Sequence, residues 1–262
     1  MDRGEDSAMT TTLNKVPQIT IYFWIIKVLA TTVGETAADL LSTRLNLGLT
    51  ITSYVMSAVF VAALIFQIRA NRYVPSIYWL TVVLISVVGT LISDNLVDGL
   101  GISLVTTSVV FAAILAAVFA LWYRRERSLS IHTIVTTRRE LYYWAAILFT
   151  FAMGTSVGDL IAETINLGYG PTALVFAGMI GLVAFVHFVI KADAIVTFWV
   201  AYILTRPLGA SIGDYLAKPV IAGGLGWGTI TTSLIFLAAI LLLVVSLTVG
   251  RPNRIEQAGA AA

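Results

Sequence analysis

The chain has 262 residues, of which 58% are hydrophobic and only 11% are charged, and its formal net charge is +2. A soluble domain carries roughly 25% charged residues, so this chain cannot cover a water-facing surface, and most of it must face lipid. Cysteine is absent, which excludes disulfides, thiolate metal sites and cysteine nucleophiles. The composition therefore predicts an all-α integral membrane protein whose main partner is the lipid bilayer, with no cofactor and no nucleic acid.

Hydropathy divides the chain into two tails, eight spans and one long linker. Residues 1–17 mix acidic and basic side chains and lack the apolar run of a cleaved signal peptide, so we expect a cytoplasmic tail there. A span needs about 20 apolar residues, and the candidates lie at 18–45, 47–68, 77–97, 101–123, 141–165, 172–190, 194–216 and 228–249. The expected divisions are the tail 1–17, a first four-helix half 18–123, a cytoplasmic linker 124–140, a second four-helix half 141–249 and a C-terminal tail 250–262.

Basic residues outside the spans gather on one side of the predicted membrane. They are Lys15, Arg69, Arg72, Arg124, Arg125, Arg127, Arg138, Arg139, Lys191, Arg251 and Arg254. Only Arg44 and Lys218 fall on the other side. Because basic residues mark the cytoplasmic side, we expect a multi-pass protein of the cell (cytoplasmic) membrane with both termini in the cytoplasm.

A six-residue motif, glycine followed after four residues by aspartate, occurs four times. Its copies at 34–39, 89–94, 154–159 and 209–214 contain the glycines Gly34, Gly89, Gly154 and Gly209 and the aspartates Asp39, Asp94, Asp159 and Asp214. Asn-Leu-Gly follows the first and third copies at 46–48 and 166–168, and Thr-Thr-Ser recurs at 106–108 and 231–233. The chain is therefore predicted to contain two duplicated halves, each built from two copies of a two-helix unit.

The four in-register motifs resemble those of a family of bacterial integral membrane proteins known mainly as a repeat of unassigned function. The likeness extends over about residues 15–249. It implies a membrane architecture of repeated two-helix units and brings no activity with it.

Each unit has an even number of spans, so every copy enters the membrane in the same orientation. The sequence thus predicts four parallel two-helix repeats with their aspartates at one depth. At a rise of 1.5 Å per residue, Asp39 lies about 10 Å below the outer surface. Thr52, Thr107 and Thr172 each follow a motif aspartate by thirteen residues, so we expect their hydroxyls to return to the depth of the carboxylates.

The aspartates are the candidate ion-binding site. A charged side chain at the centre of a span costs at least about 2.5–3.5 kcal/mol, so four matching copies favour a function. Each has an ionisable partner four residues away on the same helix face; the pairs are Glu35 with Asp39, Asp94 with Asp98, Asp159 with Glu163, and Asp214 with Lys218. The acids of these pairs predict a net-anionic interior that binds a cation, including a metal ion if one is carried, or protons. Asp98 and Glu163 are equally consistent with contact to lipid headgroups.

Arg206, Ser156 and Ser211 are expected to support this site. Arg206, which precedes Pro207 at a predicted kink, is either an internal counter-ion that competes with substrate or a structural ion-pair partner. Lys27 is expected to reach the cytoplasmic surface. The acids also admit a structural interpretation in which Arg206, Lys27 and hydroxyls satisfy them.

The glycines are expected to pack helices. Small residues four apart allow close approach, and they occur as Gly34 with Ala38, Gly154 with Gly158, and Gly209 with Gly213. This packing would keep the aspartates inside the bundle.

These features favour a secondary transporter that exports a cation in exchange for protons. Oxygen ligands without cysteine suit hard ions such as Mg²⁺, Mn²⁺, Ca²⁺ or Na⁺; a divalent metal is favoured, and an organic cation stays open because the sequence does not reveal the cavity size. The alternatives are a non-transporting scaffold, a passive channel and, less favoured, an intramembrane aspartyl hydrolase, which needs two carboxylates rather than four. We therefore expect no enzyme, and assembly into a homo-oligomer stays open.

Overall fold

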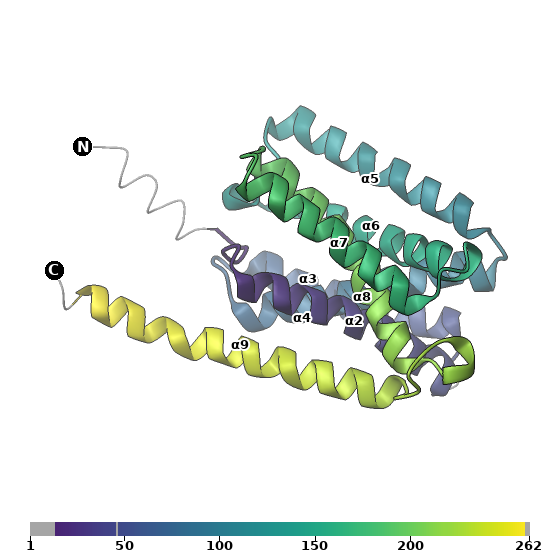
Figure 1. Cartoon of the computed structure of the whole chain (residues 1–262). Coiled ribbons are helices and arrows are strands. Elements are labelled where there is room, and N and C mark those ends of the chain that lie inside the picture. The colour runs from purple at the N-terminus through teal and green to yellow at the C-terminus, as the bar shows by residue number, and fades with distance from the viewer. Residues whose placement is uncertain (1–13, 46, 260–262) are drawn as a thin grey trace.

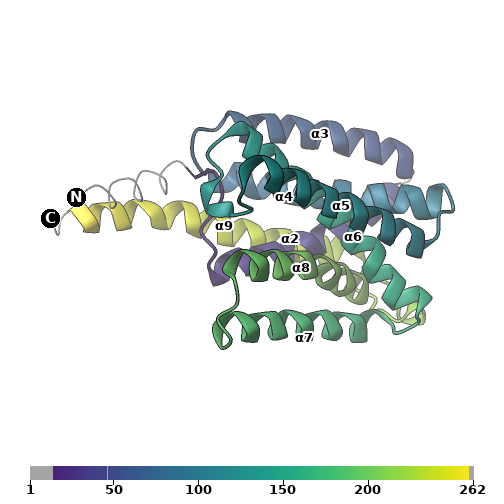
Figure 2. The same cartoon turned by 90° about the horizontal axis from the view of Figure 1, so that it is seen from above.

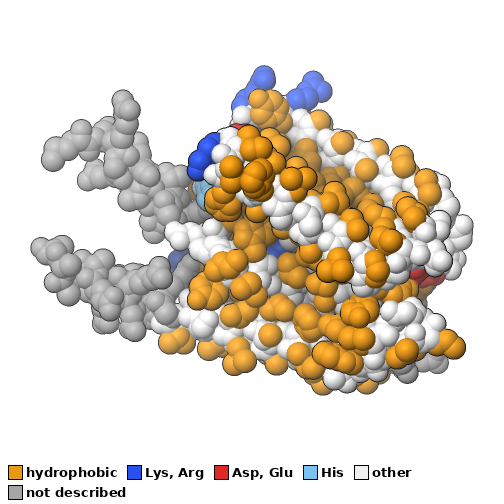
Figure 3. All heavy atoms as spheres, viewed as in Figure 1, with side chains coloured by type: hydrophobic (Ala, Val, Ile, Leu, Met, Phe, Trp, Pro, Cys, Tyr) orange, Lys and Arg blue, Asp and Glu red, His pale blue; other side chains and the backbone are white. Residues whose placement is uncertain are grey.

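All regular structure described in the computed structural model is helical. The structure describes residues 14–45 and 47–259, without the side chains of Arg44 and residues 250–259. Within this part of the chain, eight helices are long and apolar enough to cross a membrane, which confirms the predicted helical class and number of spans. Hydrophobic side chains are spread over the whole face seen in Figure 3, and few charged ones appear there, as expected of a lipid-facing surface.

Each unit contributes a first and a second helix. The first helices are α2 (Ile21–Asp39), α4 (Pro75–Asp94), α6 (Thr137–Asp159) and α8 (Ala194–Ala217). The second helices are α3 (Leu49–Arg69), α5 (Leu104–Glu126), α7 (Tyr169–Phe188) and α9 (Thr229–Gly259). Three of the first helices continue into a π-helical turn; these turns are η1 (Leu40–Arg44), η2 (Asn95–Gly99) and η4 (Leu160–Thr164). The connections in the described part of the chain also contain two short 3₁₀ segments, η3 (Ile131–Thr133) and η5 (Val220–Ala222).

Some expected boundaries differ from those observed. The last helix, α9, continues beyond the predicted end of the span at 249 to Gly259. Most of the predicted N-terminal tail, together with Asn46 of the first Asn-Leu-Gly, lies outside the described residues.

First helices form the inside of the bundle and second helices its outside. In the most apolar window of each first helix, 56% to 72% of the residues are buried, against 11% to 22% for the second helices. The inner helices contact one another in a closed ring, α2 to α4, α4 to α6, α6 to α8 and α8 back to α2. Outer helices α5 and α9 flank the ring on opposite sides in Figure 1, and α3 and α7 do so in Figure 2.

Each outer helix packs against the inner helix of the following unit. Thus α3 packs on α4, α5 on α6 and α7 on α8, and the last helix, α9, returns to pack on α2. The repeat is therefore cyclic in space, and the four motif aspartates come to the same end of the ring, which we call the aspartate end.

Glycines with positive φ allow the chain to turn between inner and outer helices. Gly48 (φ 74°) and Gly168 (φ 84°) immediately precede α3 and α7, and Gly228 (φ 79°) precedes α9. Gly101 (φ 70°) lies in the turn before α5. A side chain is strained in this conformation, which explains why the two Asn-Leu-Gly sequences end in glycine.

Buried polar contacts close the opposite end, which we call the linker end. The Lys15 ammonium lies 2.9 Å from the Glu140 carboxylate and donates to the Ile68 carbonyl at 2.8 Å. The Gln67 amide donates to the other Glu140 oxygen at 3.1 Å. The segment before α2, the end of α3 and the start of α6 are thereby joined.

The linker between the halves is docked on the bundle. The Trp199 indole donates to the Leu129 carbonyl at 2.9 Å. Arg139 donates to Glu126 at 2.7 Å, and the Thr136 hydroxyl caps the first turn of α6 by accepting from the Arg139 amide at 3.3 Å. Helices α5 and α6 consequently extend into the predicted linker from both sides.

Candidate functional site

The motif glycines set the distance between neighbouring inner helices. A Cβ added at any of them would lie 2.5–2.6 Å from the Cβ of a residue in the next unit, too close for two carbon atoms. The pairs are Gly34 with Ser86, Gly89 with Phe151, Gly154 with Arg206, and Gly209 with Thr31. Each partner stands eight residues before the aspartate of its own unit. The same contact is therefore repeated around the ring.

Because the same contact recurs between all neighbouring inner helices, equivalent residues of the four units lie in layers along the axis of the ring. Each layer contains one residue from each unit, at the same number of residues before the motif aspartate. The layer four residues before it contains Glu35, Thr90, Thr155 and Ala210, and the layer eight residues before it contains Thr31, Ser86, Phe151 and Arg206. The layer twelve residues before it contains Lys27, Val82, Ile147 and Tyr202, and the layer sixteen residues before it contains Phe23, Tyr78, Tyr143 and Phe198. All of these side chains are buried. Since residues four apart are neighbours on a helix surface, these positions form a continuous buried row along each inner helix.

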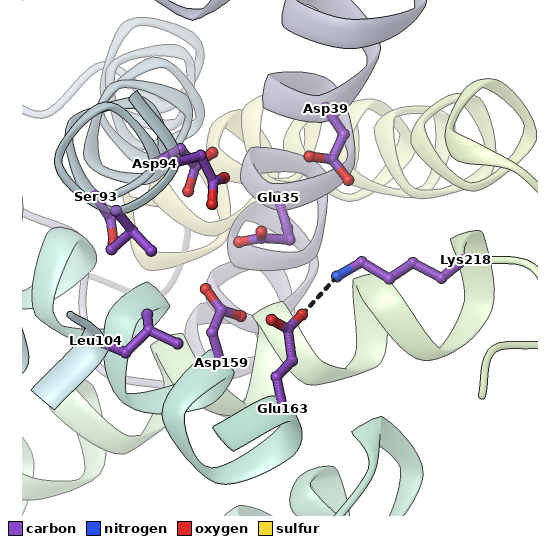
Figure 4. Close-up of a pocket in the computed structure, with 10 residues that line it drawn as sticks. Glu35, Asp39, Ser93, Asp94, Leu104, Asp159, Glu163 and Lys218 are labelled. Carbon is purple, nitrogen blue, oxygen red and sulfur yellow. Dashed lines mark hydrogen bonds and ion pairs between the residues drawn. The ribbon is translucent and has the colours of Figure 1, made fainter. Parts of the chain in front are cut away.

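A cavity of about 90 Å³ lies at the aspartate end, with room for several water molecules. Its described lining is Glu35, Asp39, Ser93, Asp94, Val97, Asp98, Leu104, Asp159, Glu163 and Lys218. Figure 4 shows carboxylates from α2, α4 and α6 directed toward this common space. Three motif aspartates and their predicted partners Glu35, Asp98 and Glu163 thus share one cavity, and Asp214 lies beside it.

The lining is strongly anionic. Among the described residues it contains six carboxylates and one ammonium group, a formal excess of five negative charges. Asp39, Asp94, Asp98 and Asp159 form no ion pair with any other described side chain. The side chain of Arg44, which the sequence places on the same side of the membrane as Lys218, lies outside the described residues. The described geometry therefore leaves most of the acidic charge unmatched.

Arg206 lies beneath the cavity and binds the next layer together. Its Nη2 donates to Glu35 at 2.8 Å, to Thr155 at 2.6 Å and, through a short hydrogen bond, to Thr90. Its Nε and Nη1 have no hydrogen-bond partner in the described part of the chain. Arg206 thus neutralises Glu35 and joins α8 to α2, α4 and α6 at one level.

Lys27 lies deeper still and does not reach the surface, so the prediction that it does is wrong. Its side chain is fully buried, because α2 occupies the ring and presents Lys27 to the axis. The ammonium lies 4.1 Å from the Phe151 ring centre and 4.2 Å from that of Tyr202, as in cation–π contacts. It has no hydrogen-bond acceptor among the described residues.

An aromatic layer fills the axis toward the linker end. The hydroxyl groups of Tyr78 and Tyr143 share a short hydrogen bond. Phe23 and Phe198 lie 6.0 Å apart between ring centres. With Arg206 and Lys27 above them, these buried side chains fill the axis beneath the cavity.

The end of the fourth unit adds a basic group to the cavity. The Lys218 ammonium lies 3.0 Å from Glu163 and 3.3 Å from Asp214 and donates to the Tyr169 hydroxyl at 2.8 Å. One carboxylate oxygen from each of Asp159, Glu163 and Asp214 lies within 4.8 Å of the other two, a spacing that a metal ion can bridge. Acid oxygens and an ammonium therefore meet at the same point.

A π-helical turn follows three of the motif aspartates directly. These turns are η1 after Asp39, η2 after Asp94 and η4 after Asp159. Single π turns inside helices are frequent at functional sites. Helix α8, the inner helix of the fourth unit, ends at Ala217 without a π-helical turn, so the unit that supplies Lys218 also differs from the others in its backbone.

The predicted hydroxyl groups lie away from the cavity. Thr52, Thr107 and Thr172 are buried, but none is among its lining residues. Thr107 and Thr172 donate instead to the carbonyls of Ser103 and Gly168, four residues earlier. Each threonine begins an outer helix, and the outer helices stand outside the ring.

The predicted serines and the remaining glycines pack helices around the cavity. Ser156 lies 3.2 Å from Ser93 between their hydroxyl oxygens, and buried Ser211 has no hydrogen-bond partner among the described residues. A Cβ at Gly213 would lie 3.2 Å from the Thr32 carbonyl oxygen, and one at Gly158 at least 3.6 Å from Pro207. Gly158 is therefore less constrained than the motif glycines.

Sequence reasoning overlooked Thr90, Thr155 and Tyr169. A signal was present for the first two, because they occupy the position of Glu35 in their own units. Tyr169 begins α7 and carried no comparable signal, since its hydroxyl reaches the cavity only through Lys218 and Glu163.

Four stretches of the chain match one family model, described as Repeat of Unknown Function (DUF347). They are residues 22–73, 77–128, 142–193 and 197–251. Each covers most of an inner helix and most or all of the outer helix that follows it. No curated protein and no solved structure matches the chain.

Proposed function

Since these matches together span most of its length, the chain belongs to this repeat family, and we propose that it is a secondary transporter. It exports a hard divalent cation, such as Mn²⁺, Mg²⁺ or Ca²⁺, in exchange for protons. The observation that carries this proposal is the single cavity lined by six carboxylates and one ammonium among the described residues.

Charge and ligand type support a cation as the cargo. Like charges at short range in a low-dielectric interior repel strongly, so a bound cation relieves an otherwise costly arrangement. The ligands on offer are carboxylate oxygens, which suit Mg²⁺, Mn²⁺ and Ca²⁺. A small volume of about 90 Å³ fits an ion with part of its water shell better than a large organic cation.

The same carboxylates supply the proton exchange. A cluster that binds a divalent ion as carboxylates can hold protons instead when the ion leaves. Cargo and protons then occupy the same groups in turn, so an exchanger needs no separate proton path. Cargo exported toward one side is replaced by protons that travel the other way.

The cavity also fits one half of an alternating-access cycle. It opens at the aspartate end, whereas Arg206, Lys27 and the aromatic layer fill the axis beneath it. We place both termini and the linker in the cytoplasm of a cell whose cytoplasmic membrane holds the four units in parallel. In that orientation the described cavity faces outward.

Flux through reconstituted protein tests the proposal. Full-length protein in liposomes is given an inward or outward pH gradient, and Mn²⁺ movement is followed with an entrapped fluorescent indicator. We expect Mn²⁺ flux that reverses with the gradient, with at least tenfold loss in Asp94→Asn and Asp159→Asn.

The matched control is Asp193→Asn. Asp193 is an exposed aspartate that caps α8 by accepting from the Ile195 and Val196 amides, and asparagine caps equally well. This variant should transport like the unaltered protein. Equal flux in all three variants would reject the cavity as the site, and flux that moves no protons would identify a passive channel instead.

A further inference from the structure

Lys218 places a positive charge on the carboxylates that are best arranged to hold a metal ion. Its ammonium contacts Glu163 and Asp214 at 3.0 and 3.3 Å. Both acids belong, with Asp159, to the group whose oxygens lie within 4.8 Å of one another. Figure 4 shows the lysine side chain extended across the cavity toward Glu163. A cation, supplied by the chain itself, already occupies this cluster.

The position of Lys218 in the repeat makes its charge an exception. Four residues after the motif aspartate, the first three units carry Thr43, Asp98 and Glu163, and the fourth carries Lys218. The repeat thus offers oxygen atoms three times and an ammonium group once. The Lys218 ammonium pairs with Asp214 of its own unit and with Glu163 of the preceding unit, so it joins two units at the cavity.

The backbone around Lys218 is fixed while its side chain is long. Helix α8 ends at Ala217, and Lys218 is extended, with φ −68° and ψ 151°. The Gly226 amide donates to the Lys218 carbonyl at 2.9 Å, and a Cβ at Gly224 would clash with the same carbonyl group. The main chain is therefore anchored, whereas the long side chain is held only through its ammonium and is 28% exposed.

Lys218 keeps its charge at neutral pH. Burial disfavours the ammonium, but the Asp214 carboxylate, the hydrogen bond to Tyr169 and the Glu163 carboxylate outweigh it and raise the pKa of Lys218 above its ordinary value of 10.5. An ordinary lysine is already charged at neutral pH, so the positive charge leaves these acids when the side chain moves away from them.

We propose that Lys218 is a tethered counter-ion that occupies the cargo site of Asp159, Glu163 and Asp214 when no cargo is bound, and that a divalent cation binds by displacing it. This inference rests on the proposed function and adds the residue that competes with cargo. Displacement exchanges one positive charge for two on the same carboxylates. A monovalent ion gains nothing over the ammonium, so Lys218 selects divalent ions.

Mn²⁺ binding to purified full-length protein tests the inference without requiring transport. Titration is followed by electron paramagnetic resonance of free Mn²⁺, at several Na⁺ concentrations. We expect Lys218→Met to bind Mn²⁺ about 5- to 150-fold more tightly, the usual range for coupling between two ligands. Na⁺ should compete much better in this variant, because the residue that excludes it is gone.

Controls separate competition from structure. Lys191→Met removes an exposed lysine elsewhere and should leave Mn²⁺ affinity unchanged. Lys218→Arg keeps the charge and should stay close to the unaltered protein. Methylammonium added to Lys218→Met should weaken Mn²⁺ binding again, which a purely structural effect would not produce. Tyr169→Phe, which removes one hydroxyl contact of Lys218, should give a smaller increase in affinity and serves if Lys218→Met does not fold.

The outcomes distinguish the two proposals. If the unaltered protein binds Mn²⁺, Asp159→Asn loses it, and Lys218→Met and Tyr169→Phe both bind like the unaltered protein, the tethered counter-ion is wrong while the carrier stands. If neither the unaltered protein nor Lys218→Met binds Mn²⁺, Mg²⁺ or Ca²⁺, the cargo class itself is wrong and the inference falls with it.

Discussion

Replacement of Gly209 by alanine adds one methyl group where α8 approaches α2. The new Cβ would lie 2.6 Å from the Thr31 Cβ and 3.1 Å from the Thr32 amide nitrogen. The Thr31 Oγ1 would lie nearer still, at 1.9 Å, but belongs to a side chain that can rotate. Ordinary contact begins at 3.4 Å, so the two Cβ atoms must separate by about 0.8 Å. Part of the obstruction is backbone, which cannot rotate away.

Two opposing effects set the size of the change. Alanine is more favourable than glycine inside a helix by roughly 1 kcal/mol, whereas overpacking of a well-packed interior costs typically about 1–3 kcal/mol. With backbone in the way the upper end applies, so we expect a net loss of about 2 kcal/mol. The measurement is the apparent melting temperature of detergent-purified protein, followed by circular dichroism.

Gly178→Ala provides the matched control. Gly178 lies inside the outer helix α7, and an added Cβ meets nothing within 4 Å, so this variant should melt at the same or a higher temperature. Thr31→Gly removes the opposing Cβ, so Gly209→Ala should cost less in the Thr31→Gly variant than in the unaltered protein. If Gly209→Ala melts as high as Gly178→Ala, or costs the same with Thr31 present and absent, the ring packing is wrong.

Three further substitutions test buried polar groups through the same melting assay. Lys27→Met should stabilise the protein by about 1–3 kcal/mol, because a buried ammonium without a hydrogen-bond acceptor among the described residues is replaced by an apolar group of similar length; a lower melting temperature would contradict this. Arg206→Met should destabilise by about 3–5 kcal/mol, because buried Glu35 loses its partner, and adding Glu35→Gln should recover much of that loss; additive losses would refute the pairing. Glu140→Gln should cost about 3 kcal/mol by leaving the Lys15 ammonium without its carboxylate, and unchanged melting would show that this contact contributes nothing.

Hydropathy and the repeated motif were sufficient to predict the helices. The span expected at 194–216 agrees closely with α8 at Ala194–Ala217. The start of α6 was missed by four residues, because its first turn, beginning at Thr137, is polar and capped by Thr136. Such a turn carries no apolar signal and is recognised only through its cap.

The rotation of each helix about its axis was harder to predict. Lys27 was expected at the surface because it lies near a span end, but its face of α2 points to the ring axis. Counting in steps of four from Asp39 through Glu35 and Thr31 reaches Lys27, so the register contained this information. It became decisive only once the inner ring was known.

The neighbours of each outer helix could not be predicted from one sequence. Helix α3 packs on the next unit rather than closing on its own, and that choice depends on the turns at Gly48 and Gly168 and on shape rather than hydropathy. For the same reason Thr52, Thr107 and Thr172 were placed near the carboxylates when they stand outside the ring.

The cyclic arrangement of four units explains how one cavity can contain several acids and a single lysine. Four identical two-helix chains around the same axis would place four copies of every residue at each level: four arginines where Arg206 stands, or four lysines at the level of Lys218. Covalent fusion into one polypeptide frees each quarter to mutate alone. Duplication of the gene therefore allowed an asymmetric electrostatic interior that a homotetramer with fourfold symmetry cannot build.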